Sequence, residues 1–337
     1  MADLRDVPLS VLDLAPVSSG SSSAAALRNS VDLARHVERL GFHRYWVAEH
    51  HNMVGIASSA PAVLIGHIAA ATSSIRVGSG GVMLPNHTPL VVAEQFGMLE
   101  AFHPGRIDLG IGRAPGTDQV TASALRRTAD ISADTFPQDL SEVMAFFEGS
   151  FPSNHVYAQI TAVPALGNMP AMWLLGSSGY SAQVAGYFGL PFAFAHHFMP
   201  DNTLPALALY RSGFRPSANL EKPYALVAAA VVCADSDERA RWLALPGALS
   251  FVRLRAGHPD VLPSPEDAAA YAYTVAERQA IETRQAHQII GDPETVRRGL
   301  TELLERTQAD ELMLTTIVHD HADRLRSYEL VAAMRGE

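Results

Sequence analysis

The chain has 337 residues, of which 48% are hydrophobic and 18% are charged, so it can bury a large core and lacks the composition of a disordered protein. The formal charge of −10 and the lack of a lysine- or arginine-rich cluster argue against binding nucleic acid through a basic surface. The single cysteine, Cys233, excludes an intramolecular disulfide and is expected to be a packed, unreactive thiol. We expect a cytoplasmic protein, because the sequence shows neither a signal-peptide pattern nor an apolar run of the roughly 18 residues that a membrane span needs.

Short apolar stretches alternate with longer segments of helical periodicity along the chain, which is typical of a parallel sheet wrapped by helices. The clearest helices are predicted over residues 23–40, 89–102 and 322–334. The eight predicted strands are residues 8–17, 44–49, 75–84, 106–112, 172–176, 191–198, 224–234 and 311–318. We therefore predict a single α/β domain over residues 1–337, a (β/α)8 TIM barrel with insertions.

Three segments exceed what a minimal barrel needs, and we predict them to be insertions at about residues 114–133, 150–170 and 245–291. The third contains glycine and proline near both ends, and residues 266–290 between them are predicted to be helical. Long insertions in a barrel commonly serve as lids or substrate walls.

Polar residues follow several of the predicted strands at their carboxyl ends, where the active sites of such barrels lie. These residues are Glu49-His50-His51, Asn86 after the Gly80-Gly81 strand, Arg113, Ser177-Ser178 and His196-His197. Their common position predicts one site at the carboxyl face.

The segment Gly176-Ser177-Ser178-Gly179-Tyr180-Ser181 opens a predicted helix and suggests an anion site. Free backbone N–H groups, hydroxyls and the helix dipole could bind a phosphate there, and Arg113 could add a cation. The alternative is an ordinary N-cap and tight turn beside a surface arginine.

Two adjacent glycines, Gly80 and Gly81, interrupt a predicted strand at a cost in strand stability. They would let a flat ligand or an unusual backbone conformation approach closely. A bulge at a barrel corner explains the same pair equally well.

The histidine pairs His50-His51 and His196-His197 raise the question of a metal, with Glu49 and Asp118 as further ligands. Adjacent residues on a strand point to opposite faces, so each pair offers one inward imidazole. Because neither histidine pair is part of an HxH or HExxH spacing, we predict no metal site and expect structural roles for His51 and for one of His196 and His197.

Taken in order, the motifs "AEHHN", "VGSGGVMLPNHTPLVVAEQFGMLEAFHPGRIDLGIGRAPGTD" and "LLGSSGYSAQVAGYFGLPFAFAHHF" resemble the bacterial-luciferase-like flavin-dependent monooxygenases. The resemblance extends from the first predicted strand to the eighth. It is closest to the subgroup with a "GRAPGTD" loop.

The resemblance implies a role for each matching residue. His50 corresponds to the family histidine that acts as a general acid or base near the reactive part of the flavin. Gly80 and Gly81 correspond to a non-prolyl cis dipeptide packed against the flavin ring. The FMN phosphate site is matched by Arg113, Ser177, Ser178, Gly179, Tyr180 and Ser181.

The chain departs from the luciferases at three positions. Gly112 stands where luciferase has a reactive cysteine, Ser177 where it has an acid, and His196 where it has a tryptophan near the flavin. Light emission from a long aldehyde is therefore not expected.

The resemblance implies a monooxygenase that takes FMNH2 from a separate flavin reductase, reacts it with O2 and oxygenates its substrate through a C4a-peroxyflavin. The protein would shield that intermediate from water. No GxGxxG motif follows a predicted strand, so a built-in nicotinamide site is not expected. Two rivals stay open: an F420-dependent oxidoreductase on the same barrel, and a non-catalytic flavin-binding partner protein.

We expect a substrate pocket above the flavin, formed by the loop after the second strand and the insertions at 114–133 and 245–291. Met53, Val54 and Ile56 fit a hydrophobic substrate or a partner surface. We predict a small hydrophobic substrate such as a natural-product intermediate, with His196 and His197 as the other candidate lining residues. The helices predicted at 60–71 and 89–101 are rich in small and apolar residues, which suits a dimer face and equally suits ordinary barrel-facing helices. With the resemblance, we predict a homodimer.

Overall fold

In the computed structural model, which describes residues 4–114, 116–125 and 135–335, eight parallel strands close into a barrel. Closure occurs where β10 pairs with both β1 and β8. The predicted (β/α)8 fold is confirmed, and each barrel strand overlaps one predicted strand. In barrel order the strands are β1 (Leu9–Asp13), β2 (Arg44–Val47), β3 (Arg76–Ser79), β5 (Ile107–Gly112), β6 (Ala171–Gly176), β7 (Phe192–Phe194), β8 (Ala225–Cys233) and β10 (Glu311–Thr315).

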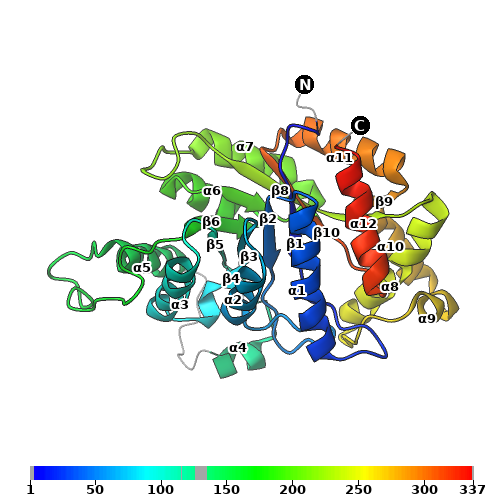
Figure 1. The fold of residues 1–337 in the computed structure, drawn as a ribbon, viewed down its shortest axis with the longest axis horizontal. Helices are drawn as coiled ribbons and strands as arrows, with labels where there is room; N and C mark the ends of the chain where they lie inside the picture. The colour runs from blue at the N-terminus through cyan, green and yellow to red at the C-terminus, as the bar shows by residue number, and fades with distance from the viewer. Residues whose placement is uncertain (1–3, 115, 126–134, 336–337) are drawn as a thin grey trace.

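Helices cover the outside of the barrel (Figure 1). The helices predicted at 23–40, 89–102 and 322–334 match α1, α3 and α12 to within one residue. The covering helices are α1 (Ser23–Arg39), α2 (Pro61–Ala71), α3 (Pro89–Phe102), α5 (Phe136–Glu148), α6 (Gly179–Phe188), α7 (Thr203–Gly213), α11 (Pro293–Thr307) and α12 (His321–Ala333). Shorter elements are β4 (Val82–Met83), η1 (Leu84–Asn86), α4 (Gln119–Leu125) and η3 (Pro200–Asn202).

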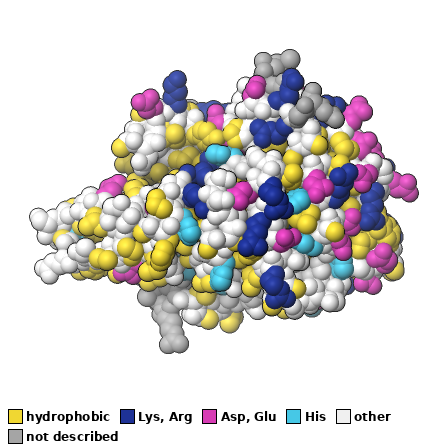
Figure 2. All heavy atoms as spheres, viewed as in Figure 1, with side chains coloured by type: hydrophobic (Ala, Val, Ile, Leu, Met, Phe, Trp, Pro, Cys, Tyr) yellow, Lys and Arg dark blue, Asp and Glu magenta, His cyan; other side chains and the backbone are white. Residues whose placement is uncertain are grey.

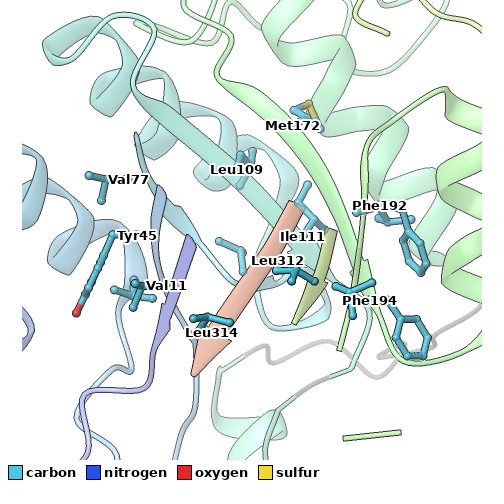
Figure 3. Close-up of a cluster of buried hydrophobic side chains, with 14 of the residues drawn as sticks. Val11, Tyr45, Val77, Leu109, Ile111, Met172, Phe192, Phe194, Leu312 and Leu314 are labelled. Carbon is cyan, nitrogen blue, oxygen red and sulfur yellow. The ribbon is translucent and has the colours of Figure 1, made fainter. Parts of the chain in front are cut away.

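The main core lies between the strands and the helices. Side chains alternate along each strand, so that Tyr45 faces the helices while Trp46 faces the barrel axis. Figure 3 shows part of the outward layer, in which Val11 and Val77 are buried near Tyr45. The barrel interior holds its own cluster: Leu12, Trp46, Ala48, Trp173, Ala193, Leu226, Ala228 and Met313.

The amino end of the barrel is closed by a network of buried charges, which we call the barrel floor: Ser10, Arg44, Arg76, Asp108, Tyr224 and Glu311. The Arg44 guanidinium lies 2.8 Å from a Glu311 oxygen and 2.9 Å from an Asp108 oxygen. Arg76 binds Asp108 from the other side at 2.6 Å. Although burial opposes the charge, the two carboxylates raise the pKa of Arg44 above its usual value.

The carboxyl end of the barrel is built from smaller residues, and we call it the barrel mouth: Leu14, Ala48, Gly80, Leu175, Ala195, Ala230 and Thr315. These positions continue the inward alternation of the interior cluster. Leu14, Leu175, Ala195 and Ala230 are only partly buried although they point inward. The mouth is therefore open to solvent, whereas the floor is closed.

The third insertion differs from its prediction. Helix α8 (Asp237–Arg255) continues through Pro246, so the predicted start of the insertion at Leu245 lies inside a helix. Pro246 is tolerated there because its ring is buried on the helix's packed face.

The expectation of one helix over 266–290 is wrong. Helices α9 (Pro265–Ala270) and α10 (Val275–Gln285) are separate, because Thr274 forms a capping box with Glu277 that starts a new helix. Residues Ile289–Gly291 then form β9, which pairs with β8 beyond the barrel.

Of the other two predicted insertions, one has no regular structure and one is described only in part. Residues 150–170 contain neither helix nor strand, as predicted. The predicted insertion at 114–133 includes α4, whereas Pro115 and residues 126–133 lie outside the described residues.

Two further expectations concern the Cys233 thiol and membrane-spanning helices. Cys233 is buried in β8, and burial raises the pKa of its thiol to about 12, as a packed and unreactive cysteine requires. Among the helices in the described ranges, none is both long and apolar enough to cross a membrane.

Replacing Arg44 with methionine should lower the free energy of unfolding by about 3 to 5 kcal/mol, because Glu311 would stay buried without its cation. Denaturant titration followed by circular dichroism measures this change. The matched control is Arg239→Met, which removes an exposed ion pair with Asp323 at 2.9 Å. The control should change stability by less than about 1 kcal/mol. Equal losses in the two variants would show that the floor does not stabilise the barrel.

Candidate functional site

Segments from five strands meet around the barrel mouth, as the common position of their polar residues predicts. His50 follows β2, the Gly80-Gly81 pair separates β3 from β4, and Arg113 follows β5. The serine turn at 177–181 joins β6 to α6, and His197 follows β7. Parallel strands bring all five segments to the same face.

The start of α6 offers unpaired hydrogen-bond donors. Ser178 is the N-cap residue in an extended conformation, and its side chain makes no capping hydrogen bond. Ser181 in the first turn is buried against Gly176, where a Cβ atom would lie 2.4 Å from the Ser181 Cβ. Glycine at 176 is therefore needed for the turn to pack this closely against its strand.

Arg113 lies beside this turn. Its guanidinium carbon is 4.4 Å from the centre of the Tyr180 ring on α6. No carboxylate of the described residues forms an ion pair with it. A cation without a neutralising acid, next to free N–H groups at a helix start, is suited to bind a phosphate.

The Gly80-Gly81 pair lies on the wall of the mouth. The peptide bond between the two residues is cis, the geometry that the family resemblance implies. A Cβ atom at Gly80 would lie 2.6 Å from Leu12 Cδ1, and one at Gly81 would lie 2.8 Å from the Gly110 oxygen. Close packing therefore requires glycine at both positions and leaves a flat backbone surface.

His50 is partly buried at the end of β2. Its backbone N–H donates to the Ser58 oxygen at 3.0 Å, which fixes the loop that follows. Burial lowers the pKa of His50 below its usual value, although a hydrogen bond with the Gly116 backbone opposes the shift. The imidazole is thus neutral near pH 7 and able to accept a proton.

Glu49 has a structural role that sequence reasoning missed. From the sequence, Glu49 was considered only as a possible metal ligand. Its buried carboxylate accepts hydrogen bonds from His51 at 2.8 Å, His87 at 2.9 Å and the Met83 N–H at 3.0 Å. Burial would raise the pKa of Glu49, but the hydrogen bonds from His87, His51 and Met83 outweigh it and lower the pKa. Glu49 therefore ties the end of β2 to β4 and to the segment after η1. The only sequence signal for this network was the position of Glu49 between an apolar strand and two histidines.

The two histidines after β7 point in different directions. His197 Nδ1 bonds to the Ala228 oxygen on β8 at 3.0 Å, whereas His196 Nδ1 bonds to Thr203 Oγ1 on α7 at 2.8 Å. Burial lowers the pKa of both imidazoles to about 4, so both are neutral near pH 7. Of the two candidate lining residues, His197 is the one on the barrel side and His196 is turned toward a helix.

The loop with Met53, Val54 and Ile56 is held at the rim of the mouth. Ile56 bridges to Pro16, and Gly55 packs so closely on residue 260 of the third insertion that a Cβ would lie 2.5 Å from the Asp260 oxygen. Met53 and Ile56 are partly buried, whereas Val54 is 61% exposed. The loop and the third insertion thus meet, as the predicted pocket requires.

The segment after β5 also reaches this loop. Asn52 Nδ2 donates to Asp118 Oδ2 at 3.0 Å, and Thr117 Oγ1 donates to the His51 oxygen at 3.2 Å. The side chains once considered as metal ligands are therefore engaged in hydrogen bonds with neighbouring side chains or with the backbone. In the parts of the chain that the structure describes, no group of three His, Cys, Asp or Glu side chains is arranged to hold a metal.

Comparison with known proteins finds relatives that match nearly the whole chain. A curated luciferase-like monooxygenase of Escherichia coli K12 is 49% identical over 99% of this chain and 98% of its own length. The N-acetyl-S-alkylcysteine monooxygenase of Bacillus subtilis is 35% identical over 97% of each chain. The crystal structure of apo-MsnO8 superposes with a TM-score of 0.89 at 39% identity, covering 97% of this chain and 98% of that one.

More distant solved structures share the fold alone. They include an FMN complex of the oxygenating constituent of a diketocamphane monooxygenase from Pseudomonas putida, at 20% identity and a TM-score of 0.71. An F420-dependent secondary alcohol dehydrogenase matches at 14% identity and a TM-score of 0.70. The family model described as luciferase-like monooxygenase matches residues 7–311. On this match and on its curated relatives, the chain belongs to the luciferase-like monooxygenase family.

Proposed function

We propose that the protein is a monooxygenase that uses FMNH2 from a separate flavin reductase, together with O2, to oxygenate a small hydrophobic organic substrate. The observation that carries the proposal is Arg113, which lies without an acidic partner among the described residues beside the unpaired donors of α6. This arrangement fits the phosphate of a flavin at the barrel mouth.

The residues at the mouth fit FMN in two parts. Arg113, the Ser177, Ser178 and Ser181 hydroxyls and the N–H groups of Gly179 and Tyr180 would hold the phosphate. Gly80 and Gly81 would lie beside the flavin ring, at a point where close packing against Leu12 and Gly110 leaves no room for a side chain. Bound FMNH2 supplies the electrons that activate O2.

The chain's own residues supply positioning, proton transfer and exclusion of water. His50 is neutral and can accept or return a proton beside the flavin site. Glu49 holds the end of β2 against β4, which sets His50 relative to the Gly80-Gly81 pair. The apolar residues of the mouth exclude water once a substrate covers them.

Oxygenation is favoured over hydride transfer by the relatives with the higher identities, two of which are named monooxygenases. The distant F420-dependent structure keeps F420 as the second candidate cofactor. Anaerobic titration with FMNH2 and with reduced F420 separates the two. Failure to bind either would favour a non-catalytic partner protein.

The proposed substrate is apolar because Met53 and Ile56 lie partly buried at the rim of the mouth. The relative that acts on an N-acetyl-S-alkylcysteine takes a small molecule with an alkyl chain. An oxygenation of a natural-product intermediate would fit a pocket of this kind.

We further propose a homodimer through α2 and α3, which touch each other on the outside of the barrel. Four apolar side chains are exposed on these helices, at 64% for Val63, 42% for Val91, 50% for Met98 and 74% for Phe102. Figure 2 shows hydrophobic side chains gathered over this part of the molecule, around α3 and α5. Such a patch suits a symmetric helix contact.

Arg113→Ala should weaken FMNH2 binding by at least about tenfold, because it removes the charge partner of the phosphate. Anaerobic fluorescence titration measures the dissociation constant. Arg215→Ala is the matched control, since Arg215 lies over Tyr187 at the other end of α6 with the same 4.4 Å spacing. An unchanged affinity in Arg113→Ala would refute the phosphate site.

His50→Ala should reduce the product formed per FMNH2 consumed and leave FMNH2 affinity nearly unchanged. His50→Asn keeps a hydrogen-bonding side chain but transfers no proton, so it should lose product as well. Because the pKa of His50 lies below 6.5, activity should be retained at neutral pH and fall as the pH is lowered through that pKa. Full product yield in both variants would assign His50 a structural role.

Sedimentation equilibrium should show a dimer for the wild type and a monomer for Phe102→Asp, because a buried charge at the interface is unpaired. Val275→Asp on α10 is the control, since Val275 is 86% exposed and lies outside the patch. A wild-type monomer would rule out the dimer.

A further inference from the structure

Arg284, near the end of α10, is a partly buried cation without an acidic partner. Its guanidinium carbon lies 4.5 Å from the centre of the Phe251 ring, and Nη1 donates to the Gly247 oxygen at 3.3 Å. No carboxylate of the described residues forms an ion pair with it, and burial lowers its pKa with no opposing contribution. A buried guanidinium in this state is unfavourable unless an anion joins it.

Arg284 lies over the barrel mouth. Its acceptor residue, Gly247, is next to Ile317 just after β10, where a Cβ at Gly247 would lie 3.8 Å from the Ile317 oxygen. Burial lowers the pKa of His197 at the end of β7, and the charge of Arg284 adds to this shift. Since β8 lies between β7 and β10 in the barrel, the cation is placed near the carboxyl end of β8.

Thr315 is a second vacant polar group facing the same opening. It is the last residue of β10, points inward by alternation from Met313, and is only 4% exposed. Its buried hydroxyl has no hydrogen-bond partner among the described residues. Buried hydroxyls are nearly always bonded, so an unpaired one at an open mouth indicates a place for a ligand atom.

This position is separate from the proposed flavin phosphate site. Arg113 and the start of α6 belong to β5 and β6, whereas Arg284 lies two to three strands further around the barrel. The apolar rim with Met53 and Ile56 follows β2, on the far side of β1. The mouth thus offers an anion site at one edge and apolar contacts at the opposite edge.

We propose that the substrate carries a carboxylate, which Arg284 binds at the barrel mouth, while Thr315 donates a hydrogen bond to a polar atom of the same molecule. A guanidinium matches a carboxylate with two parallel hydrogen bonds, and one cation balances one negative charge. The inference rests on the proposed function, which it deepens: the substrate is an apolar acid rather than a neutral hydrophobic molecule.

The test measures binding of three apolar carboxylates and of their primary amides by calorimetry: octanoate, phenylacetate and N-acetyl-S-benzylcysteine. In the wild type at least one acid should bind at least about tenfold more tightly than its amide, because only the acid pairs with the guanidinium. Arg284→Met should abolish the preference for the acid. Thr315→Val should weaken the acid and its amide alike.

Arg278→Met is the matched control, because Arg278 is an exposed cation on the same helix, 5.7 Å from the Tyr273 ring. It should keep the wild-type preference. Arg284→Met should unfold at the same temperature as the wild type or higher, since it removes an uncompensated buried charge. Should that variant fail to fold, Arg284→Lys replaces it and should reduce the preference.

Absence of an acid preference in all three pairs, or its persistence in Arg284→Met, would overturn the proposal. The same would follow if Arg284→Met weakened FMNH2 binding instead, which would make Arg284 a cofactor ligand. A wild type that prefers the acid but does not bind FMNH2 would refute the proposed monooxygenase and leave the carboxylate site standing.

Discussion

The pairing of Arg44 with Glu311 and Asp108 is the interaction on which the rest of the structure depends. A barrel of parallel strands must fill its axis, and here the amino end is filled by charges that are stable only as a complete set. The network joins five strands and holds them in register through Ser10, Arg44, Arg76, Asp108 and Glu311. With the floor fixed by charge, the opposite end can be lined with alanine and glycine without loss of the barrel.

The residues that stabilise the barrel and the candidate functional residues thus lie at opposite ends of the barrel axis. The floor and the middle layer around Trp46 and Trp173 are closely packed, whereas the mouth is open and has both polar and apolar side chains at its rim. Glu49 lies between the packed interior and the open mouth. It is fully buried, yet its carboxylate holds the segments that carry His50 and the Gly80-Gly81 pair. Residues at the rim can change with the substrate while the floor stays the same.

The sequence predicted the barrel because parallel strands buried on both faces appear as short apolar runs, and it predicted the mouth because carboxyl ends converge. It did not predict the Glu49 network, since His87 is 38 residues away and nothing local marks the pair. Nor did it predict α8 through Pro246, because burial of a helix face outweighs a local breaker. The sequence did not mark Arg284 either. A single arginine on a polar helix becomes notable only when the structure places that helix over the barrel mouth. The roles of His50, Arg113 and the serine turn stay predictions, although the fold brings them together.

The origin of Glu311 in the last strand has a consequence for how the chain is made. Arg44 and its partner are 267 residues apart, so the cation emerges from the ribosome long before the acid that neutralises it. Until β10 inserts between β1 and β8, the sheet keeps two open edges, and Arg44 can pair with Asp108 but not with Glu311. Closure of the barrel therefore has to wait until β10, the last of its eight strands, has been synthesised.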